Sequence, residues 1–379
     1  MSLFANTVLR NSLHNHFRLC VPFRTLYVTQ VQHLYSQSAL GIDGYLQTRK
    51  RVKEQFSNFT DKFRTKMVEF VQDPKNMVFT EDLKNMVHIA DPTDLELVMD
   101  MIKKFNSNKS EFRFGSFVFG PVVMRMYHFL DAPNEALKCF EDPEISGFFD
   151  QLVSYHILLD LLYCHEMYDE MYRVFEKVKE TQINMTKFPK YPVVLILAAC
   201  YKQNTPKSME YARNLWTEMN DVGASPVRRA CIFFAALALK QGAPHIALET
   251  ISTQKQHYVT VRNIKAMALA DVGRVDDALP VLRSVLDIDI PEEKDKHTFF
   301  EDTISRVKAA VEKKNDKDIQ KQFENIEKEL RDRRLVDNSQ TLEHLLNAEI
   351  TTSPKKKEKP RGMPFQKKMP YANRQKRNY

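Results

Sequence analysis

Residues 153–175 read VSYHILLDLLYCHEMYDEMYRVF, and this stretch decides the fold. Its first part, VSYHILLDLLY, contains one charged residue, Asp160, and is too apolar to be an exposed helix. Its second part, EMYDEMYRVF, mixes charged and apolar residues and ends at Phe175. The stretch therefore predicts a helical hairpin whose first helix is buried by its own partner and by a neighbouring hairpin.

The same pattern recurs between about residue 114 and residue 291. Five segments resemble the second part of this stretch, and they end at Phe140, Phe175, Trp216, Ile251 and Leu282. These end residues are 35, 41, 35 and 31 positions apart. Apolar segments precede them, among them PVVLILAACYK, RACIFFAALALK and VRNIKAMALA. Two-helix units of about 34 residues are typical of tetratricopeptide and pentatricopeptide arrays. We therefore predict an all-α, right-handed solenoid of about five helical hairpins, with the extra residues of the 41-residue interval in the turn around Asn204–Pro206.

The flanks of the array differ from it in composition. Residues 45–110 predict an N-terminal helical segment, in which Tyr45–Val71 forms one charged helix and a helical hairpin follows. Residues 294–350 predict charged C-terminal helices, either one long amphipathic helix or a hairpin. These helices are expected to cap the last hydrophobic face of the solenoid, because an array needs a polar end, with a short coiled coil as the alternative.

The N-terminus has the composition of an import signal. Residues 1–42 contain no Asp or Glu, while Arg10, Arg18 and Arg24 are spread among apolar, Ser and Asn residues. Import into the mitochondrial matrix requires such an acid-free, Arg-bearing leader, and we expect cleavage shortly after Arg24. A basic N-terminus without a targeting role is the alternative.

The positive charge of the chain is concentrated at its other end. The formal net charge is +7, but residues 351–379 contain ten Lys or Arg and one Glu, which leaves −2 for the rest. This tail, rich in Lys, Pro, Arg and Gln, should stay unfolded. It can contact phosphates, and a purely solubilising tail is the alternative.

Several classes of function lack their sequence motifs. No HExxH, GxxxxGK[ST], GxGxxG or GxSxG pattern occurs, so we predict no enzyme, no cofactor and no metal. Cys164 and His165 are adjacent, but neighbours on a helix project about 100° apart and do not converge on one atom. The longest uncharged apolar runs, Val193–Cys200 and Cys231–Leu239, are shorter than the ~20 residues of a membrane span. A solvated turn is expected for the acidic cluster of Asp287, Asp289, Glu292 and Glu293.

Cations recur near the start of successive first helices. In a solenoid, equivalent positions of successive units fall along one line, so these side chains would form a row that can follow a sugar-phosphate backbone. Solubilising the helix ends is the alternative role. The six residues are Lys187, Lys190, Arg228, Arg229, Arg262 and Lys265.

Four segments resemble more than a general helical repeat. FVFGPVVMRMYHFLD, ISGFFDQLVSYHILLDLLY, ILAACYKQNTPKSMEY and RRACIFFAALALKQG are similar to the pentatricopeptide repeat family of metazoan mitochondria. The resemblance covers residues 45–345 and is strongest over 114–242. It implies a location in the mitochondrial matrix and a part in the maturation of mitochondrial transcripts, with effects on the respiratory chain.

The resemblance also implies which residues would read RNA bases. In pentatricopeptide repeats a base is read chiefly by one residue early in the first helix and one at the end of the repeat. Only Asn263 is a typical base reader here, because valine and isoleucine cannot distinguish hydrogen-bonding edges. Aligned on the second-helix ends, the first of the two positions falls on His156, Val194, Ile232 and Asn263.

Together these features predict a non-catalytic mitochondrial protein that binds single-stranded mitochondrial RNA during transcript processing. Mitochondrial RNA-processing or respiratory-complex proteins are the further partners that we expect. A helical-repeat scaffold or assembly factor is the alternative, which the apolar base-reading positions and the slightly acidic body favour. An RNA-cleaving enzyme is the third hypothesis, which metal-dependent cleavage by the pure chain would support.

Deleting residues 351–379 should weaken RNA binding without changing the preference among RNA sequences. The ten cations of the tail lack a fixed geometry for reading bases, but each neutralised phosphate releases counterions. The slope of log affinity against log salt, about −0.7 per contact on single strands, should therefore become flatter. Titrations of several RNA sequences over a range of salt measure both quantities. A truncated protein that kept its affinity but lost its sequence preference would contradict this prediction.

Overall fold

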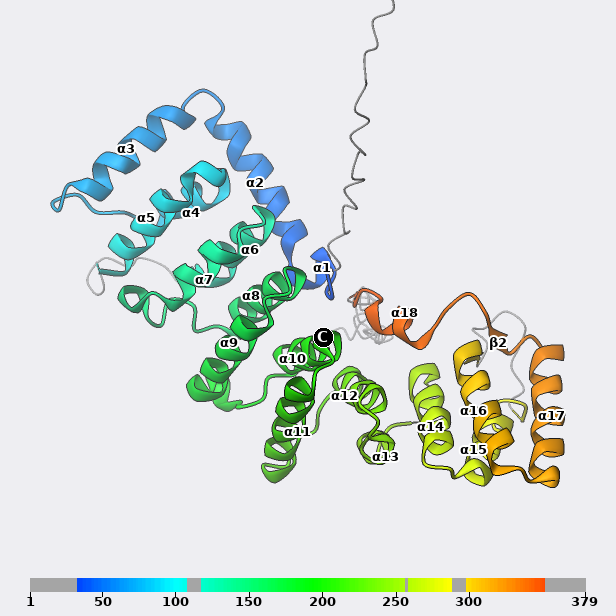
Figure 1. Cartoon of the computed structure of the whole chain (residues 1–379). Coiled ribbons are helices and arrows are strands. Elements are labelled where there is room, and N and C mark those ends of the chain that lie inside the picture. The colour runs from blue at the N-terminus through cyan, green and yellow to red at the C-terminus, as the bar shows by residue number, and fades with distance from the viewer. Residues whose placement is uncertain (1–32, 108–116, 256–257, 288–297, 352–379) are drawn as a thin grey trace, which may run out of the picture. The chain divides into compact units, whose positions relative to one another are not determined.

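The computed structural model shows a succession of helical hairpins (Figure 1). The two strands among the described residues are two residues each, and the predicted all-α class of helical-repeat solenoid is confirmed. None of the described helices is long and apolar enough to cross a membrane. Residues 1–32 of the predicted leader, residues 352–379 of the basic tail and the acidic cluster after Asp287 lie outside the described residues, whereas residues 33–42, which the predicted leader also included, are part of the described fold and contain α1. The structure describes residues 33–107, 117–255, 258–287 and 298–351.

Each hairpin has a first helix that packs against the first helices of the neighbouring hairpins. These first helices are α2 (Ile42–Phe56), α4 (Thr80–Ile89), α6 (Gly120–Phe129), α8 (Leu152–Cys164), α10 (Lys190–Gln203), α12 (Arg228–Lys240), α14 (Val259–Asp271) and α16 (Glu301–Lys314).

The second helices cover the first ones, except that α3 packs against α4 and α5 of the next hairpin. The second helices are α3 (Thr60–Gln72), α5 (Leu95–Ser107), α7 (Pro133–Glu141), α9 (Tyr168–Thr181), α11 (Pro206–Asp221), α13 (Pro244–Ile251), α15 (Val275–Arg283) and α17 (Lys317–Asp332). The short elements are α1 (Gln37–Leu40), η1 (Pro92–Asp94), η2 (Pro143–Ile145), η3 (Ile183–Met185), β1 (Phe299–Phe300), β2 (Val336–Asp337) and α18 (Leu342–Asn347).

The first helices of the central hairpins are buried because neighbours cover them on both sides. In α10 every residue from Pro192 to Tyr201 is buried, and in α12 every residue from Ala230 to Leu239. α10 packs against α8 and against α12, with α9 and α11 also in contact. A helix that is hydrophobic all round is stable only under such cover, so the sequence of these helices enforces the stacking.

The turns inside the hairpins are short. From α6 onward, each contains one residue with a positive φ. Between α10 and α11 this residue is Asn204, with φ 46°, and Thr205 follows as the N-cap of α11. Gly242 takes the same role between α12 and α13, with φ 69°, a conformation that glycine adopts without a steric penalty.

Two predicted details are wrong. The turn at Asn204–Pro206 contains no extra residues; the interval is longer because the second helices α9 and α11 have 14 and 16 residues, whereas α7 and α13 have 9 and 8. Tyr45–Val71 is not one helix, because α2 ends and a turn at residues 57–59 redirects the chain. The break lets α2 pack against α4 while α3 packs against α5, which one continuous helix could not do.

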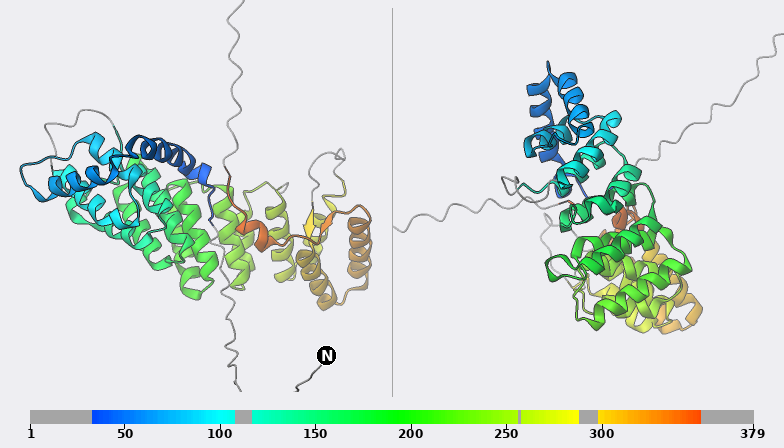
Figure 2. Two further views of the ribbon diagram at one scale, coloured as in Figure 1. Left: turned by 90° about the horizontal axis from the view of Figure 1, so that it is seen from above. Right: turned by 90° about the vertical axis from the view of Figure 1, so that its left-hand side faces the viewer.

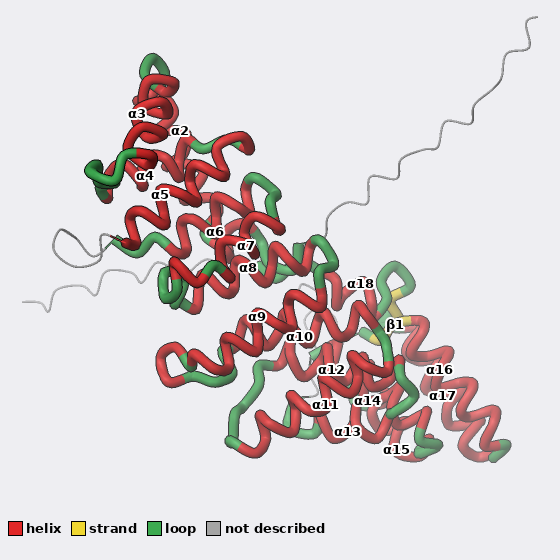
Figure 3. The backbone as a smooth tube through the Cα atoms, turned by 60° about the vertical axis from the view of Figure 1, so that its left-hand side comes forward, coloured by secondary structure: helices red, strands yellow, loops and turns green. Residues whose placement is uncertain are grey.

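The charged C-terminal residues form a hairpin, α16 and α17, that packs against α14 and α15 (Figures 2 and 3). After α17 the chain pairs β2 with β1 in parallel, with Phe299 opposite Val336. α18 then packs against α14. The last described residues therefore run back along the first helices of earlier hairpins.

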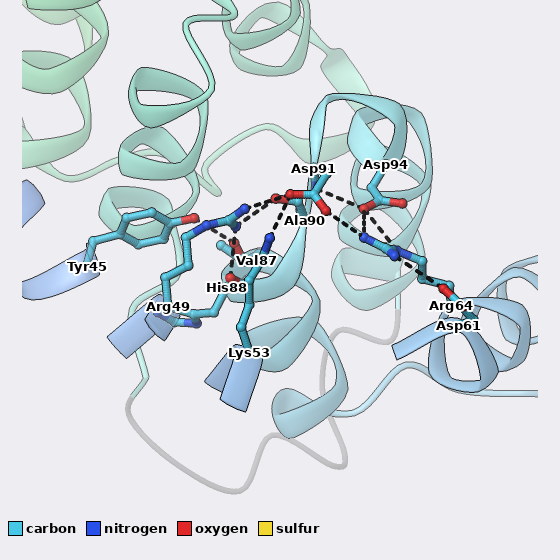
Figure 4. A network of polar contacts seen from close by, with 10 residues as sticks. All are labelled: Tyr45, Arg49, Lys53, Asp61, Arg64, Val87, His88, Ala90, Asp91 and Asp94. Atoms are coloured by element: carbon cyan, nitrogen blue, oxygen red, sulfur yellow. Dashed lines mark hydrogen bonds and ion pairs between the residues drawn. The ribbon is translucent and has the colours of Figure 1, made fainter. Parts of the chain in front are cut away.

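A cluster of polar contacts joins α2 and α3 to the connection between α4 and α5 (Figure 4). The guanidinium of Arg49, whose side chain is 8% exposed, donates to the carbonyls of His88 at 2.9 Å and Ala90 at 2.7 Å. It also donates to Asp91 Oδ1 at 2.8 Å, and Arg64 donates to the other oxygen of that carboxylate at 3.0 Å. Arg49 thus satisfies carbonyls that the end of α4 leaves without partners.

Replacing Arg49 with Ala should lower the free energy of unfolding by about 3 kcal/mol, because two carbonyls and a carboxylate lose a buried donor. Arg51 is exposed on the same helix, and Arg51→Ala is the matched control, with an expected change below about 0.5 kcal/mol. Urea titrations followed by circular dichroism measure both changes. Equal effects of the two substitutions would show that the contacts of Arg49 do not stabilise the fold.

Candidate nucleic-acid interface

A pocket opens at the N-terminal ends of α8 and α10, bordered by the segment that leads through α1 into α2. Its volume is about 690 Å³. Sites for small ligands measure about 300 to 1,000 Å³, so the pocket has room for a nucleotide. The lining residues used below are Tyr35, Arg125, His156, Lys190, Tyr191 and Ile350.

Three aromatic rings form one wall of the pocket. The rings of His156 and Tyr191 are stacked, with centroids 5.0 Å apart and planes at 14°. Tyr35 meets the His156 ring edge-on, at a centroid distance of 4.4 Å. Tyr191 is 59% exposed although one face of its ring lies on His156. An exposed ring backed by a stacked partner is a platform on which an unstacked base can lie.

His156 supplies this wall with a neutral ring. Burial lowers its pKa to about 4, against the raising effect of Asp160. Its Nε2 has no hydrogen-bond partner among the described residues. The ring therefore contributes a stacking surface and an unpaired nitrogen, and it carries no charge near neutral pH.

Two cations border the same pocket. Lys190 is the first residue of α10 and is exposed. Arg125 on α6 donates from Nε to the carbonyl of Leu40 at 2.8 Å, and burial lowers the pKa of its guanidinium. Gly41, with φ 71°, permits this approach, because a Cβ there would meet Arg125 Nη2 at 2.9 Å. Arg125 is therefore held by the chain, whereas Lys190 extends into solvent.

The predicted base-reading positions lie inside the protein. Val194 and Ile232 are each 1% exposed, and Asn263 is 0% exposed. His156 is 7% exposed and reaches the pocket through its ring. Because adjacent first helices pack together at these positions, the side chains of Val194, Ile232 and Asn263 cannot contact a base in this structure.

Asn263 instead organises the start of α16. Its Oδ1 accepts from the Phe300 amide at 2.9 Å and from the Thr303 hydroxyl at 2.7 Å, and its Nδ2 donates to the Val259 carbonyl at 2.8 Å. The residue before α16, Phe300, has no side-chain oxygen that could cap the helix. The side chain of Asn263 therefore supplies the acceptor that holds α16 against α14.

The predicted row of cations is interrupted by internal contacts. Arg229 donates to the carbonyls of Leu346 at 2.8 Å and Ala348 at 2.9 Å, at the end of α18. Arg262 is 1% exposed and donates to the Thr298 carbonyl at 3.1 Å. Both arginines satisfy backbone carbonyls of the C-terminal part of the chain, so these contacts within the protein interrupt the predicted row at Arg229 and Arg262.

The other predicted cations differ in their access to solvent. The Nζ of Lys187 lies 3.4 Å from Oε2 of Glu218, with which it forms an ion pair. Lys265 is half-buried and lines a separate pocket. Arg228 is exposed, with its guanidinium carbon 3.7 Å from the centroid of the Tyr258 ring. Arg228 and Lys190 therefore keep the predicted position, extending into solvent at the start of a first helix.

Two terminal segments, residues 33–36 and 348–351, meet over the first-helix ends. The Ile350 amide donates to the Leu34 carbonyl at 2.8 Å, and the Ser36 amide donates to the Ile350 carbonyl at 3.1 Å. Ile350 also lines the pocket. The two segments thus form part of the pocket wall together.

Four of the six lining residues named above were not found from the sequence. Tyr191 has a detectable signal, since it is an aromatic residue beside the predicted cation Lys190 at a helix start. Tyr35, Arg125 and Ile350 have none, because their positions depend on packing between segments distant in the sequence.

Curated proteins with sequence similarity to this chain share one name. The chain is 27% identical over 216 residues to pentatricopeptide repeat-containing protein 2, mitochondrial, of Mus musculus, covering 57% of this chain and 56% of the relative. The proteins of that name from Danio rerio and Xenopus laevis are 29% and 33% identical over 196 and 148 residues, or 50% and 38% of their lengths. The chain resembles pentatricopeptide repeat-containing protein 2. This confirms the resemblance drawn from the sequence. The matched region spans between 38% and 56% of the length of these relatives, and no family model matches.

In this relative of pentatricopeptide repeat-containing protein 2, Asn263→Ala should lower the free energy of unfolding by about 1–3 kcal/mol, because two buried donors lose their acceptor. RNA affinity should not change. Asn220, exposed on α11, provides the control, and Asn220→Ala should change stability by less than about 0.5 kcal/mol. Denaturant titrations and RNA binding assays measure the two effects separately. A loss of RNA affinity at unchanged stability would instead support the base-reading role that the resemblance implies.

Proposed function

We propose that the chain is a non-catalytic RNA-binding protein of the mitochondrial matrix that takes part in the maturation of mitochondrial transcripts. In this role it supports the respiratory chain. The names of the relatives, which contain both pentatricopeptide repeat and mitochondrial, support RNA association and the organelle. The leader without acidic residues supports import.

The observation that carries the proposal is the stacked pair of Tyr191 and His156 beside Lys190. A base splayed out of a single strand would stack on the exposed face of Tyr191, and Lys190 would neutralise a flanking phosphate. Stacking needs an unpaired base, because a base inside a duplex does not expose its face. The pocket therefore favours single-stranded RNA.

This mode of binding tolerates many sequences. Every base has a face that can stack, and the buried Val194, Ile232 and Asn263 offer no edge for reading bases in successive repeats. The protein would then hold or shield a transcript with limited selectivity, and the basic tail would add phosphate contacts.

Tyr191→Ala should weaken binding of single-stranded RNA by roughly 5- to 150-fold, because one base loses a stacking contact of about 1–3 kcal/mol. Tyr191→Phe keeps the ring and should bind within about twofold of the unchanged protein, since the hydroxyl adds little to stacking. Fluorescence anisotropy with labelled RNA and the full chain measures both. Circular dichroism shows whether the variants remain folded.

Equal affinities of Tyr191→Ala and the unchanged protein would contradict this site. A folded full chain that binds no RNA near physiological salt would contradict the function itself. The second candidate, a scaffold that binds peptides, would then be favoured by a specific observation: residues 33–36 and 348–351 already lie as extended segments over the first-helix ends. Crosslinking in mitochondria that recovers proteins without RNA would support it.

A further inference from the structure

Four side chains that can bind a metal converge between the N-terminal segment, α6 and α8. The ligand atoms of His33, His128 and Asp160 all lie within 4.8 Å of one another. Asp160 Oδ2 lies 3.1 Å from His128 Nε2 and 3.6 Å from His33 Nδ1. The Sγ of Cys164, one helical turn after Asp160, lies 2.9 Å from His33 Nδ1 and 4.0 Å from Asp160 Oδ2. Nitrogen, oxygen and sulfur donors therefore face one small volume.

Asp160 is held as a metal-binding carboxylate is usually held. Its side chain is fully buried, and its Oδ1 accepts a hydrogen bond from the Tyr35 amide at 3.2 Å. The second oxygen is left to face the two imidazoles and the thiol. Burial would raise the pKa of Asp160, but the hydrogen bonds to His128 and His33 outweigh burial and lower it, so the group is ionised. Hydrogen bonds to the outer atoms of a ligand fix its orientation toward the metal.

The spacing of the donors fits a tetrahedral ion. Zinc lies about 2.0–2.3 Å from nitrogen, oxygen and sulfur ligands, which places neighbouring ligand atoms about 3.3–3.8 Å apart. The separations of Asp160 from His128, His33 and Cys164, and of Cys164 from His33, lie between 2.9 Å and 4.0 Å and span this range. Cys164 is not among the three residues whose ligand atoms all lie within 4.8 Å of one another, so its side chain would have to move toward them to complete the geometry. One carboxylate and one thiolate also neutralise the charge of Zn²⁺, which makes burial of the loaded site electrostatically acceptable.

We propose that His33, His128, Asp160 and Cys164 bind one Zn²⁺ as a closed structural site. On binding, the Cys164 thiol loses its proton to solvent and coordinates as a thiolate. Four protein ligands fill the coordination shell, so the site provides structure and not catalysis. Because Tyr35 lies two residues after His33, the metal would fix the segment that forms part of the pocket wall.

Without a metal, the same residues would form a buried ion pair between histidine and aspartate. Burial raises the pKa of the Cys164 thiol, so in that case Cys164 stays a neutral thiol beside them. The two possibilities differ in whether the chain takes up one equivalent of metal and whether the thiol becomes a ligand. Both properties can be measured independently of RNA.

The test uses the full chain, purified with an affinity tag that contains no histidine and with its thiols reduced. We expect one equivalent of Zn²⁺ by elemental analysis after loading and dialysis. Titration with Co²⁺ should give the charge-transfer absorption of a cobalt–thiolate bond and the visible bands of tetrahedral cobalt. Loading with Zn²⁺ should raise the melting temperature, because the metal binds the folded state, and a chelator should reverse the shift.

Two variants and a matched control locate the site. His33→Gln changes a side chain that is 36% exposed, so the chain should still fold, and metal affinity should fall by at least about tenfold. Cys164→Ser should remove the cobalt–thiolate absorption. His165→Gln is the control, because His165 adjoins Cys164 in sequence but contacts Asp131 at 2.6 Å, and its metal affinity should be unchanged.

A folded chain that takes up no stoichiometric Zn²⁺ or Co²⁺, with no effect of either on the melting temperature, would overturn the proposal. So would metal uptake that His33→Gln and Cys164→Ser leave unchanged. If His165→Gln lowered the metal affinity as much as His33→Gln does, the metal would bind elsewhere, and this result would also overturn the proposal.

Discussion

The fold depends on one constraint, which is that the first helices of the central hairpins are apolar on every side. Water cannot solvate such a surface at low cost, and burying it contributes about 25 cal/mol for each Å² of apolar area removed from water. A single second helix can cover only part of the surface. The remainder is covered by the first helices of the hairpins before and after, as α8 and α12 cover α10. When the hairpins stack in sequence order, the apolar surface of every first helix is covered.

The same constraint determines where polar chemistry can occur. Side chains in the middle of the central first helices are buried, so contact with a ligand is confined to helix ends and connections. Tyr191 and Lys190 are accessible because they begin α10, whereas Val194, one helical turn later, is 1% exposed. Polar groups that do enter the stack need internal partners, because an unpaired buried group costs about 1–3 kcal/mol. Asn263 and Arg262 meet this need by bonding to residues 298–303.

The sequence was sufficient for the features that depend on local pattern. The apolar runs around Leu158, Leu197 and Phe234 indicate first helices, and the spacing of the second-helix ends indicates the repeat. Contacts between distant segments could not be predicted in this way. Asn263 has the residue type of a base reader, and only its bonds to Phe300 and Thr303, across 37 and 40 residues, reveal a structural role.

The candidate site was predictable to the same limited degree. Lys190 and His156 were identified from their positions near the start of first helices, and both line the pocket. The lining also includes Tyr35, residues 38–41 and Ile350, which approach from the two ends of the described chain. Pattern within a repeat carries no information about such segments, because they lie outside the repeats and pack by tertiary contacts alone. The interruption of the cation row at Arg229 has the same origin, since its partners lie at the end of α18.

The pocket is therefore only as well ordered as the segment containing Tyr35. Fixing the backbone of each residue costs about 1–2 kcal/mol, and a net hydrogen bond returns only about 0.5–1.5 kcal/mol. The backbone amide of Tyr35 donates a hydrogen bond to Asp160, and the Tyr35 ring contacts the rings of both His156 and Tyr191. Order in this segment is therefore coupled to order in the aromatic wall. His33 adds a contact to the same carboxylate. Asp160 is thus the buried group through which the N-terminal segment, α6 and α8 are held together, and any interaction that strengthens its contacts also stabilises the wall on which a base would stack.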